Sequence, residues 1–419
     1  MSEWYLEFVD TGYEPSEGEL VAEFYMEPSG VSPEEAAGRI ASESSIGTWT
    51  TLWKLPDKAK ELMATAYGIE RRGEGYLVRI AYPLELWEEG SIVQLMSGIA
   101  GNIFGMKAVR SLRLLDFEIP REYAESFRGP GSGARGVREF MRVGSRPLTA
   151  TVPKPKIGWS VEEYAEIAEE LWMGGIDLLK DDENFTSPSF NRFEKRVKRL
   201  YRVMEKAERE TGDKKEYLVN ITAPFEVMKR RAELVAEHGG RYVMIDIVVA
   251  GFSAVQGMRE VCGELELAIH AHRAMHAAFT RSQRHGISML ALAKFARMAG
   301  VDQLHTGTAI GKLESKAEEV RRINEALLGK WHHFKPVLPV SSGGLHPGLI
   351  PEIIRLFGSE LVIQAGGGVM GHPQGPRAGA KALRDAVDAA MEGRELRDKA
   401  EESRELEAAL QKWGDVRPV

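Results

Sequence analysis

The stretch Gly174-Gly-Ile-Asp-Leu-Leu-Lys-Asp-Asp-Glu-Asn184 (GGIDLLKDDEN) decides the fold of this chain. Its mostly apolar segment, residues 176–179, has the length of a short buried strand, and it ends directly in a lysine followed by acidic residues. Helical patterns of apolar residues precede it at 161–173 and follow it at 192–210. A short apolar strand between two amphipathic helices predicts one β/α unit of a parallel sheet.

The same alternation continues from residue 147 onward, with further helical patterns such as 227–238 and 376–392. Eight strand candidates separated by helices predict a (β/α)8 barrel, or TIM barrel. A doubly wound open sheet is the alternative, but it would need a glycine fingerprint after its first strand, where this chain has Pro153-Lys-Pro-Lys156. The strand candidates are residues 148–152, 176–179, 217–221, 242–247, 266–271, 303–305, 337–340 and 361–364.

The first 128 residues mix strand-like and helical segments, which predicts a smaller α+β domain with a mostly antiparallel, ferredoxin-like sheet. The strand-like segments are 20–26, 76–82 and 109–115, and the helical ones are 33–42 and 92–99. A glycine-rich stretch at 128–136 interrupts the periodicity and is the candidate boundary or linker. We therefore expect an N-terminal domain of residues 1–128 and a barrel domain of residues 129–419 with a charged, helical C-terminal extension.

Composition excludes several classes of protein. The chain has 419 residues, 43% of them hydrophobic, a net charge of −7 and a single cysteine, Cys262. One cysteine excludes an intramolecular disulfide, and an acidic balance gives no basic surface for nucleic acid. We find no signal peptide in the first residues and no apolar run long enough to cross a membrane. A cytoplasmic enzyme with neither nucleic-acid nor membrane partners is expected.

Polar residues after barrel strands are informative because active sites of barrels form at the carboxyl ends of the strands. Lys154 and Lys156 follow the first strand, where like-charge repulsion would lower the pKa of a lysine and suit it to proton transfer. A solvated basic turn is the alternative.

Lys180 follows the second strand beside Asp182 and Glu183. If CO2 adds to the Lys180 amine, the carbamate and the two carboxylates give three oxygen ligands suited to Mg2+. Helix capping by the acidic residues is the simpler alternative.

The later strands end in histidines, an arginine and glycines. His270, His272 and Arg273 end the fifth strand and His305 the sixth, either as an active-site cluster or as a hydrogen-bonded cluster in the core. Residues 307–312 form a glycine-flanked loop ending in Lys312, either a mobile lid or an ordinary loop. Glycine-rich turns after the seventh and eighth strands favour phosphate binding by backbone amides. They contain Ser342, Gly343 and Gly344, and Gln364, Ala365, Gly366 and Gly367.

These residues together predict a Mg2+-dependent barrel enzyme that abstracts a proton beside a carbonyl of a phosphorylated sugar. The N-terminal segments 43–50 and 101–105 are polar or bracketed by glycine, and by themselves they predict only loops.

At this point the chain resembles a known family, the large subunit of ribulose-1,5-bisphosphate carboxylase/oxygenase (RuBisCO), most closely its archaeal form III. The similarity extends over essentially the whole chain. It rests on the motifs ESSIGTWT (43–50), GNIFGM (101–106), KPKI (154–157), GGIDLLKDDEN (174–184), HRAMH (272–276), HTGTAIGKLE (305–314), SGGLH (342–346) and GGGVMGHP (366–373).

The resemblance implies a role for each matching residue. Lys180 would be carbamylated by an activating CO2, bind Mg2+ with Asp182 and Glu183, and take the C3 proton of ribulose 1,5-bisphosphate. Lys154 would be a general acid/base and His272 the base for hydration. Lys312 would stabilise the new carboxylate and pair with Glu43 on closure. Substrate contacts would come from Lys156, Arg273, His305, Ser342, Gly343, Gly344, Gln364, Ala365, Gly366 and Gly367.

The resemblance also implies partners. Glu43, Thr48, Trp49 and Asn102 would contact substrate from a neighbouring subunit, so the chain would act as a dimer or a multiple of dimers without a small subunit. CO2 and O2 would compete for the same intermediate. Form III relatives imply a substrate supplied by nucleoside monophosphate breakdown. The alternative is a RuBisCO-like enolase or isomerase that acts on a sugar phosphate without carboxylation.

Overall fold

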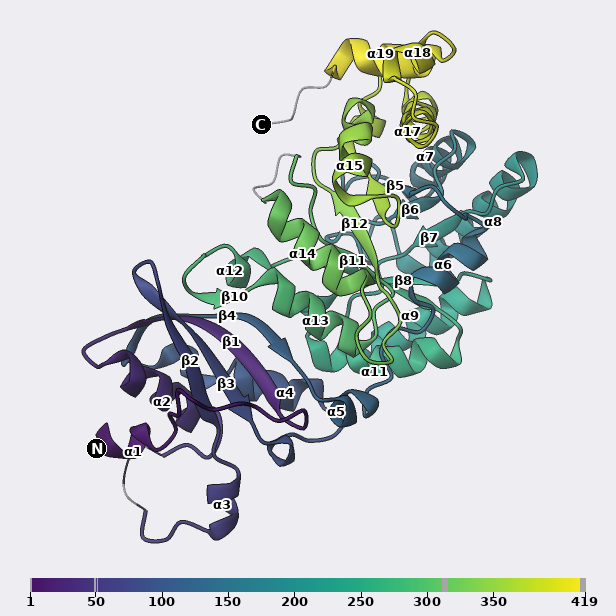
Figure 1. Cartoon of the computed structure of the whole chain (residues 1–419). Helices are drawn as coiled ribbons and strands as arrows, with labels where there is room; N and C mark the ends of the chain where they lie inside the picture. The colour runs from purple at the N-terminus through teal and green to yellow at the C-terminus, as the bar shows by residue number, and fades with distance from the viewer. Residues whose placement is uncertain (1, 49, 51, 311–315, 415–419) are drawn as a thin grey trace. The chain divides into compact units, whose positions relative to one another are not determined.

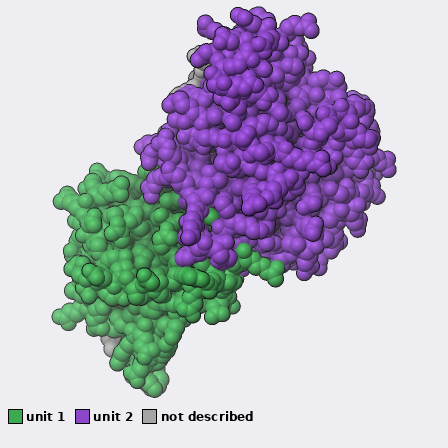
Figure 2. All heavy atoms as spheres, turned by 45° about the vertical axis from the view of Figure 1, so that its right-hand side comes forward, with its two compact units in different colours: residues 1–128, 275–298 green, residues 129–274, 299–419 purple. Residues whose placement is uncertain are grey.

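The structure is a computed structural model that describes residues 2–48, 50, 52–310 and 316–414. Its chain forms two compact units, one of residues 1–128 with 275–298 and the other of residues 129–274 with 299–419 (Figures 1 and 2). The segment 275–298 thus leaves the second unit directly after Ala274 and folds with the first.

The first unit is an α+β domain built on a five-stranded sheet, counted over the described residues, with the order β10-β4-β1-β3-β2. Strands β1 to β4 pair antiparallel, and β10 adds parallel to β4. This order confirms the ferredoxin-like prediction. The elements are α1 (Ser2–Leu6), β1 (Leu20–Pro28), α2 (Pro33–Glu43), α3 (Asp57–Glu61), β2 (Thr65–Arg72), β3 (Gly75–Tyr82), η1 (Leu84–Leu86), α4 (Ile92–Ile99), η2 (Asn102–Gly105), β4 (Val109–Glu118), α5 (Arg121–Glu125), α12 (Ala277–Thr280), β10 (Gly286–Ile287) and α13 (Met289–Ala299).

Two strands of this sheet were not expected from the sequence. Strand β2 is an edge strand whose residues are mostly half-buried or exposed, so it lacks the apolar alternation that marks β1. Strand β10 has only two residues and lies far along the chain from its partner β4. Neither strand has a sequence pattern of its own that predicts it, because each forms by pairing with a neighbouring strand.

The second unit is the barrel. Its elements are α6 (Gly133–Met141), β5 (Leu148–Thr151), α7 (Val161–Met173), β6 (Leu178–Lys180), α8 (Phe193–Thr211), β7 (Glu216–Leu218), α9 (Phe225–Glu237), β8 (Tyr242–Asp246), α10 (Ile247–Ala250), α11 (Phe252–Glu264), β9 (Ala268–His272), β11 (Gln303–His305), α14 (Ala317–Leu328), β12 (Leu338–Ser342), η3 (Pro347–Leu349), α15 (Ile350–Phe357), β13 (Val362–Gln364), α16 (Gly367–Met370), α17 (Pro376–Met391), α18 (Leu396–Ala400) and α19 (Arg404–Trp413).

Within the described residues, eight parallel strands follow the order β7-β6-β5-β13-β12-β11-β9-β8. The two ends of this order meet where Asn220 bridges Met244, and the Ile221 N–H donates to the Met244 carbonyl at 3.0 Å. Side chains including Leu148, Leu178 and Val340 fill the interior, which is therefore a packed core and not a pore. The predicted (β/α)8 barrel is confirmed.

The sequence correctly indicated the helix before β6. Helix α7 begins with a capping box, in which the Ser160 hydroxyl accepts from the Glu163 amide and the Glu163 carboxylate accepts from the Ser160 amide. No helix in the described ranges is both long and apolar enough to cross a membrane.

Within the boundary or linker candidate 128–136, the division between the two units falls after Arg128, and α6 already begins at Gly133. The buried Asp302 carboxylate accepts from the Ser132 and Gly133 amides, both at 2.7 Å. The Arg259 guanidinium donates to the Gly129 carbonyl at 2.8 Å. Glycine is needed here because a Cβ on Gly129, which has a φ of 63°, would lie 2.5 Å from the Phe334 ring.

Candidate functional site

Strand β6 delivers Lys180 and two carboxylates to the carboxyl end of the barrel. The Lys180 side chain is buried, and its Nζ donates to the Asp181 carbonyl at 2.8 Å. The Asp182 carboxylate lies 2.8 Å from Lys154 Nζ and 4.0 Å from Lys156 Nζ. The turns after β5 and β6 therefore bring Lys154, Lys156 and Asp182 together, as the sequence predicted.

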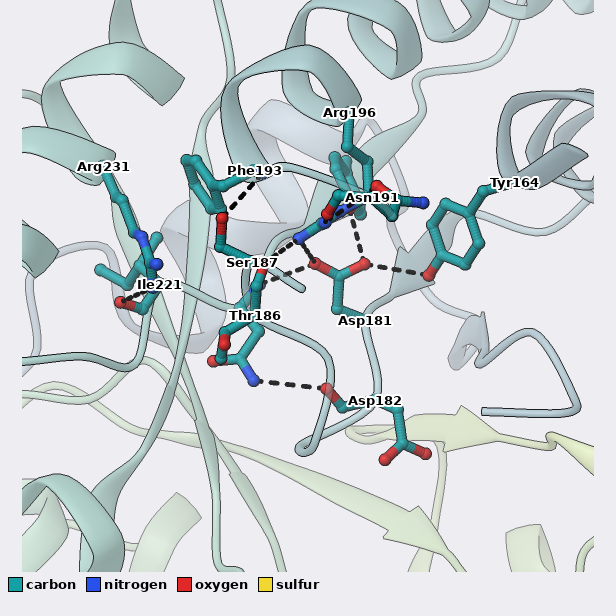
Figure 3. Close-up of polar contacts among 12 residues, drawn as sticks. Tyr164, Asp181, Asp182, Thr186, Ser187, Asn191, Phe193, Arg196, Ile221 and Arg231 are labelled. Atoms are coloured by element: carbon teal, nitrogen blue, oxygen red, sulfur yellow. Dashed lines mark hydrogen bonds and ion pairs between the residues drawn. The ribbon is translucent and has the colours of Figure 1, made fainter. Parts of the chain in front are cut away.

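Asp181 points away from these groups and anchors the turn (Figure 3). Its carboxylate accepts from the hydroxyls of Tyr164 and Tyr217 at 2.9 and 2.6 Å and from Arg196 at 3.2 Å. The Asn220 side-chain amide donates to the carbonyls of residues 182 and 183 at 3.3 and 3.1 Å. The strand alternation predicts this outward direction, and the network fixes the backbone that carries Asp182 and Glu183.

The donor set offers a divalent cation three anionic oxygens if Lys180 is modified. No cluster of three His, Cys, Asp or Glu side chains with metal-binding geometry occurs among the described residues. Asp182 and Glu183 provide two carboxylates, and a carbamate on Lys180 would provide the third anionic oxygen. Burial lowers the pKa of Lys180, which favours the neutral amine that reacts with CO2. These three residues therefore fit Mg2+, with Lys180 as carbamate.

A hydrogen-bonded histidine chain extends from the barrel interior toward the cavity described below. His270 Nδ1 donates to the Gln303 side-chain carbonyl at 2.7 Å, so His270 Nε2 accepts from His305 Nε2 at 2.9 Å. His305 Nδ1 then accepts from the Ser342 hydroxyl at 2.7 Å. Burial lowers the pKa of His270 to about 3 and also lowers that of His305. Both rings are therefore neutral, and the chain orients Ser342.

His272 has the geometry of a general base. Its Nδ1 donates to the Asp246 carboxylate at 2.8 Å, and its Nε2 lies 3.8 Å from a Glu183 oxygen. Burial, followed by the charge of Lys180, lowers the pKa of His272 to about 3. Burial also raises the pKa of Asp246 to about 6. A neutral imidazole with its Nδ1 proton held by Asp246 leaves Nε2 free to accept a proton.

These groups open into a cavity of about 800 Å3 in the barrel mouth. The turns after β12 and β13 form one wall, and Gly366 approaches Lys154 so closely that a Cβ would lie 3.3 Å from Lys154 Cε. The cavity is lined by Val152, Lys154, Asp182, Glu183, His272, Ser342, Gly343, Gly344, Leu345, His346, Gln364, Gly366, Gly367, Gly368, Lys412 and Trp413.

Five of the described residues predicted for the barrel lie outside this lining, and one of them, Lys180, is buried. Lys156 is half exposed and contacts Asn184 through its ammonium. Arg273 is half-buried after β9, and burial lowers its pKa to about 10. His305 lies behind Ser342. Ala365 is buried, and its amide and carbonyl bond to Ala150 and Thr151, so it fixes the turn and offers no surface.

Of the predicted residues of the first unit, Glu43 and Asn102 lie at the ends of helical elements and Thr48 lies in a loop. Glu43 is the last residue of α2 and is exposed, and Asn102 opens η2. The Thr48 hydroxyl donates to the Thr50 carbonyl at 2.8 Å. Trp49 and Lys312 lie outside the residues that the structure describes.

Sequence reasoning missed several residues of the site, among them Asp246, Lys412 and Trp413. Asp246 ends the apolar run of β8 at the carboxyl end of the barrel, the same signal that identified Lys180. Lys412 and Trp413 come from the last turn of α19, where a charged helical pattern indicated only an outer helix. Only the tertiary structure brings that turn to the barrel mouth.

Comparisons with known proteins agree on one family. The model of the ribulose bisphosphate carboxylase large chain, N-terminal domain, matches residues 7–123, and that of the catalytic domain matches residues 133–413. The ribulose bisphosphate carboxylase of Pyrococcus abyssi is 70% identical over 99% of this chain and 98% of its own length. That of Archaeoglobus fulgidus is 48% identical over 100% of this chain and 99% of its own length.

Solved structures give the same result. The octameric RuBisCO of Pyrococcus horikoshii OT3, in complex with sulfate, matches with a TM-score of 0.97 and 70% identity over 98% of this chain and 97% of that one. The dimeric archaeal RuBisCO of Hyperthermus butylicus matches with a TM-score of 0.94 and 50% identity over 98% and 100%. The chain belongs to the ribulose bisphosphate carboxylase large-chain family and is an enzyme of the carboxy-lyase class.

Proposed function

We propose that this chain adds CO2 to ribulose 1,5-bisphosphate and cleaves the product to two molecules of 3-phosphoglycerate, with O2 as a competing co-substrate. One observation carries the proposal. The buried Lys180, whose pKa is lowered, ends the strand that leads into Asp182 and Glu183, and these two carboxylates line the same cavity as two glycine turns that suit phosphate groups. A non-catalytic sugar-phosphate binder would have no use for that lysine.

The proposed cofactors are Mg2+ and an activating CO2. Mg2+ would be held by the Lys180 carbamate, Asp182 and Glu183, and when bound it would stabilise negative charge on the enediolate oxygens. The Asp181 network would keep the two carboxylates on the cavity side of the turn.

Proton movements are assigned to residues of this chain. The Lys180 carbamate would take the proton from C3 to give the enediolate, whose C2 attacks CO2. His272 Nε2 would take a proton from the water that adds to the C3 ketone. Cleavage of the C2–C3 bond leaves a carbanion that Lys154 would protonate. The 2.8 Å contact between Lys154 and Asp182 supports this role because it holds the ammonium in the cavity.

Substrate positioning is assigned to the cavity wall and its surroundings. One phosphate would contact the backbone amides of Gly344, Gly366 and Gly367, and the other would contact Arg273 and His305. Ser342, oriented by His305, would bind a sugar hydroxyl, and Gly343 and Gln364 would complete the wall. Lys156 would contact substrate near the metal, and Lys312 would stabilise the new carboxylate.

We further propose a homo-oligomer of dimers without a small subunit, in which Glu43, Thr48, Trp49 and Asn102 act in the neighbouring subunit's site. The homo-oligomeric relatives, one octameric and one dimeric, support this assembly. The family-model boundaries support domains of residues 1–128 and 129–419. A cytoplasmic location and a substrate derived from nucleoside monophosphates complete the proposal, and they rest on the resemblance to form III.

The test is fixation of labelled CO2 into acid-stable product after preincubation with bicarbonate and Mg2+. We expect fixation by the wild type, none by Lys180→Ala, and wild-type fixation by Lys206→Ala, which removes an exposed lysine of α8. Exchange of the C3 hydrogen with solvent deuterium, without fixation, would contradict the carboxylase assignment and favour the RuBisCO-like enolase.

A further inference from the structure

The end of helix α19 forms part of the cavity wall, yet the proposed function gives it no role. Lys412 and Trp413 line the cavity together with the turn from Ser342 to His346 and the turn from Gly366 to Gly368. The helix is fixed at its start by Ser403, whose hydroxyl accepts from the Leu406 amide at 3.1 Å. Its buried residues Leu406 and Ala409 anchor it, so its last turn has a defined position.

Trp413 packs between segments that follow the two glycine turns. Its ring stacks on His346 with centroids 5.8 Å apart and planes 22° apart, and it lies 6.5 Å from the ring of His372. His372 Nε2 donates to the Glu405 carbonyl at 2.8 Å, and His372 Nδ1 accepts from the Gln374 amide at 3.1 Å. The indole therefore joins the strand ends of β12 and β13 to the C-terminal helix.

The backbones of the two turns and of the helix end approach one another closely near Trp413. A Cβ on Gly348 would lie 1.8 Å from the Gly414 carbonyl oxygen, and one on Gly368 would lie 2.1 Å from the Leu345 carbonyl oxygen. A Cβ on Gly371 would contact the Trp413 ring at 3.5 Å. The two turns and the helix end thus pack as one unit, and a shift of the helix would move both turns.

Lys412 places a positive charge on the same wall. Its ammonium donates to the Gly371 carbonyl at 2.5 Å and lies 5.2 Å from the Trp413 ring centroid. Of the two described lysines in the cavity lining, Lys154 is paired with the Asp182 carboxylate, whereas Lys412 forms no ion pair with the described residues. Its charge is therefore available to an anion at the glycine turns.

We propose that α19 contributes to binding of the substrate phosphate, with Lys412 adding a positive charge to the pocket of the glycine turns and Trp413 acting as a positioning residue that holds the two turns together. This inference rests on the proposed function for the identity of the anion, a sugar bisphosphate. It means that α19, a helix outside the (β/α)8 repeat, contributes to the affinity for the substrate.

The charge is tested by steady-state kinetics of Lys412→Gln, with Lys412→Arg as rescue and Arg404→Gln as control. Arg404 is an exposed cation of the same helix that does not line the cavity. We expect Lys412→Gln to raise KM for ribulose 1,5-bisphosphate roughly fivefold while kcat stays within about twofold of the wild-type value. Added salt should reduce the difference in KM between the variant and the wild type. Lys412→Arg and Arg404→Gln should keep the wild-type KM. An unchanged KM in Lys412→Gln would overturn the role of the charge.

The positioning role is tested with Trp413→Ala and Trp413→Phe. The alanine variant should raise KM about tenfold, and phenylalanine, which can still stack on His346, should restore KM to within about twofold of the wild type. An unchanged KM in Trp413→Ala would overturn the role. If Trp413→Ala does not fold, the test uses the tryptophan fluorescence of the wild type and of Trp413→Phe. The difference between the two signals reports Trp413 and should change on titration with ribulose 1,5-bisphosphate. A difference that stays constant during the titration would refute the positioning role.

The two proposals fail in different ways. A wild-type enzyme that fixes no labelled CO2 refutes the proposed function. A wild type that fixes CO2, with variants at residues 412 and 413 that keep its KM, refutes only the inference about α19.

Discussion

Asp181 and Arg196 form an ion pair in which both side chains are fully buried, 3.2 Å apart. Removing one partner of such a pair leaves the other charged and desolvated. We predict that Asp181→Asn lowers the free energy of unfolding by roughly 3 kcal/mol, measured by urea denaturation. The exposed pair Arg199–Glu162 is the control, and Glu162→Gln should change stability by less than about 0.5 kcal/mol. Equal effects of the two substitutions would contradict the anchoring role of Asp181.

Glu216 is a buried carboxyl at the start of β7, where burial raises its pKa to about 8. Glu216 stays protonated in the folded state up to about pH 8, whereas in the unfolded state it ionises near its ordinary pKa of 4.5. The unfolded state therefore binds fewer protons between pH 4.5 and about pH 8, and the free energy of unfolding falls as the pH rises through this range. Arg241 and Glu208 are the nearby charged groups.

We predict that Glu216→Gln becomes increasingly more stable than the wild type between about pH 5 and 8, by roughly 1.4 kcal/mol per pH unit. Thermal unfolding across this range measures the difference. Glu205→Gln, at an exposed position of α8, should show no such trend. A difference that stays constant with pH would show that Glu216 is ionised in the folded enzyme.

At the level of elements, the turn after β13 offers a matched pair of glycines. A Cβ on Gly368 would lie 2.1 Å from the Leu345 carbonyl oxygen and 2.6 Å from His346 Cα, whereas one on Gly367 would meet nothing within 4 Å. We predict that Gly368→Ala lowers the free energy of unfolding by about 2 kcal/mol and that Gly367→Ala leaves it nearly unchanged. Similar melting temperatures for the two variants would show that the turns after β12 and β13 are not packed as described.

The sequence predicted the barrel elements well because each strand is a short apolar run between amphipathic helices, and because the candidate site residues follow the strands directly. Lys180, His272 and Ser342 were found in this way. Strand β2 and the role of Trp413 were not, because an edge strand and a helix end take their partners from distant parts of the chain. Asp246 ends an apolar strand as Lys180 does, but the sequence analysis did not select it.

At the level of the whole molecule, the proposed dimer predicts that two inactive variants complement each other. Lys180→Ala lacks the metal ligand, and Glu43→Ala lacks the residue supplied to the neighbouring subunit. A mixed dimer would contain one intact site, so mixing the subunits after reversible dissociation should restore about a quarter of wild-type activity. No recovery in verified mixed dimers would show that Glu43 serves the site of its own chain.

The central claim is that the enzyme carboxylates ribulose 1,5-bisphosphate, and the carbon balance of the reaction tests it most directly. With 13CO2 and unlabelled bisphosphate in the absence of O2, NMR of the products should show two molecules of 3-phosphoglycerate per bisphosphate consumed, one of them labelled in its carboxyl carbon. Consumption of the bisphosphate without labelled 3-phosphoglycerate would contradict the claim.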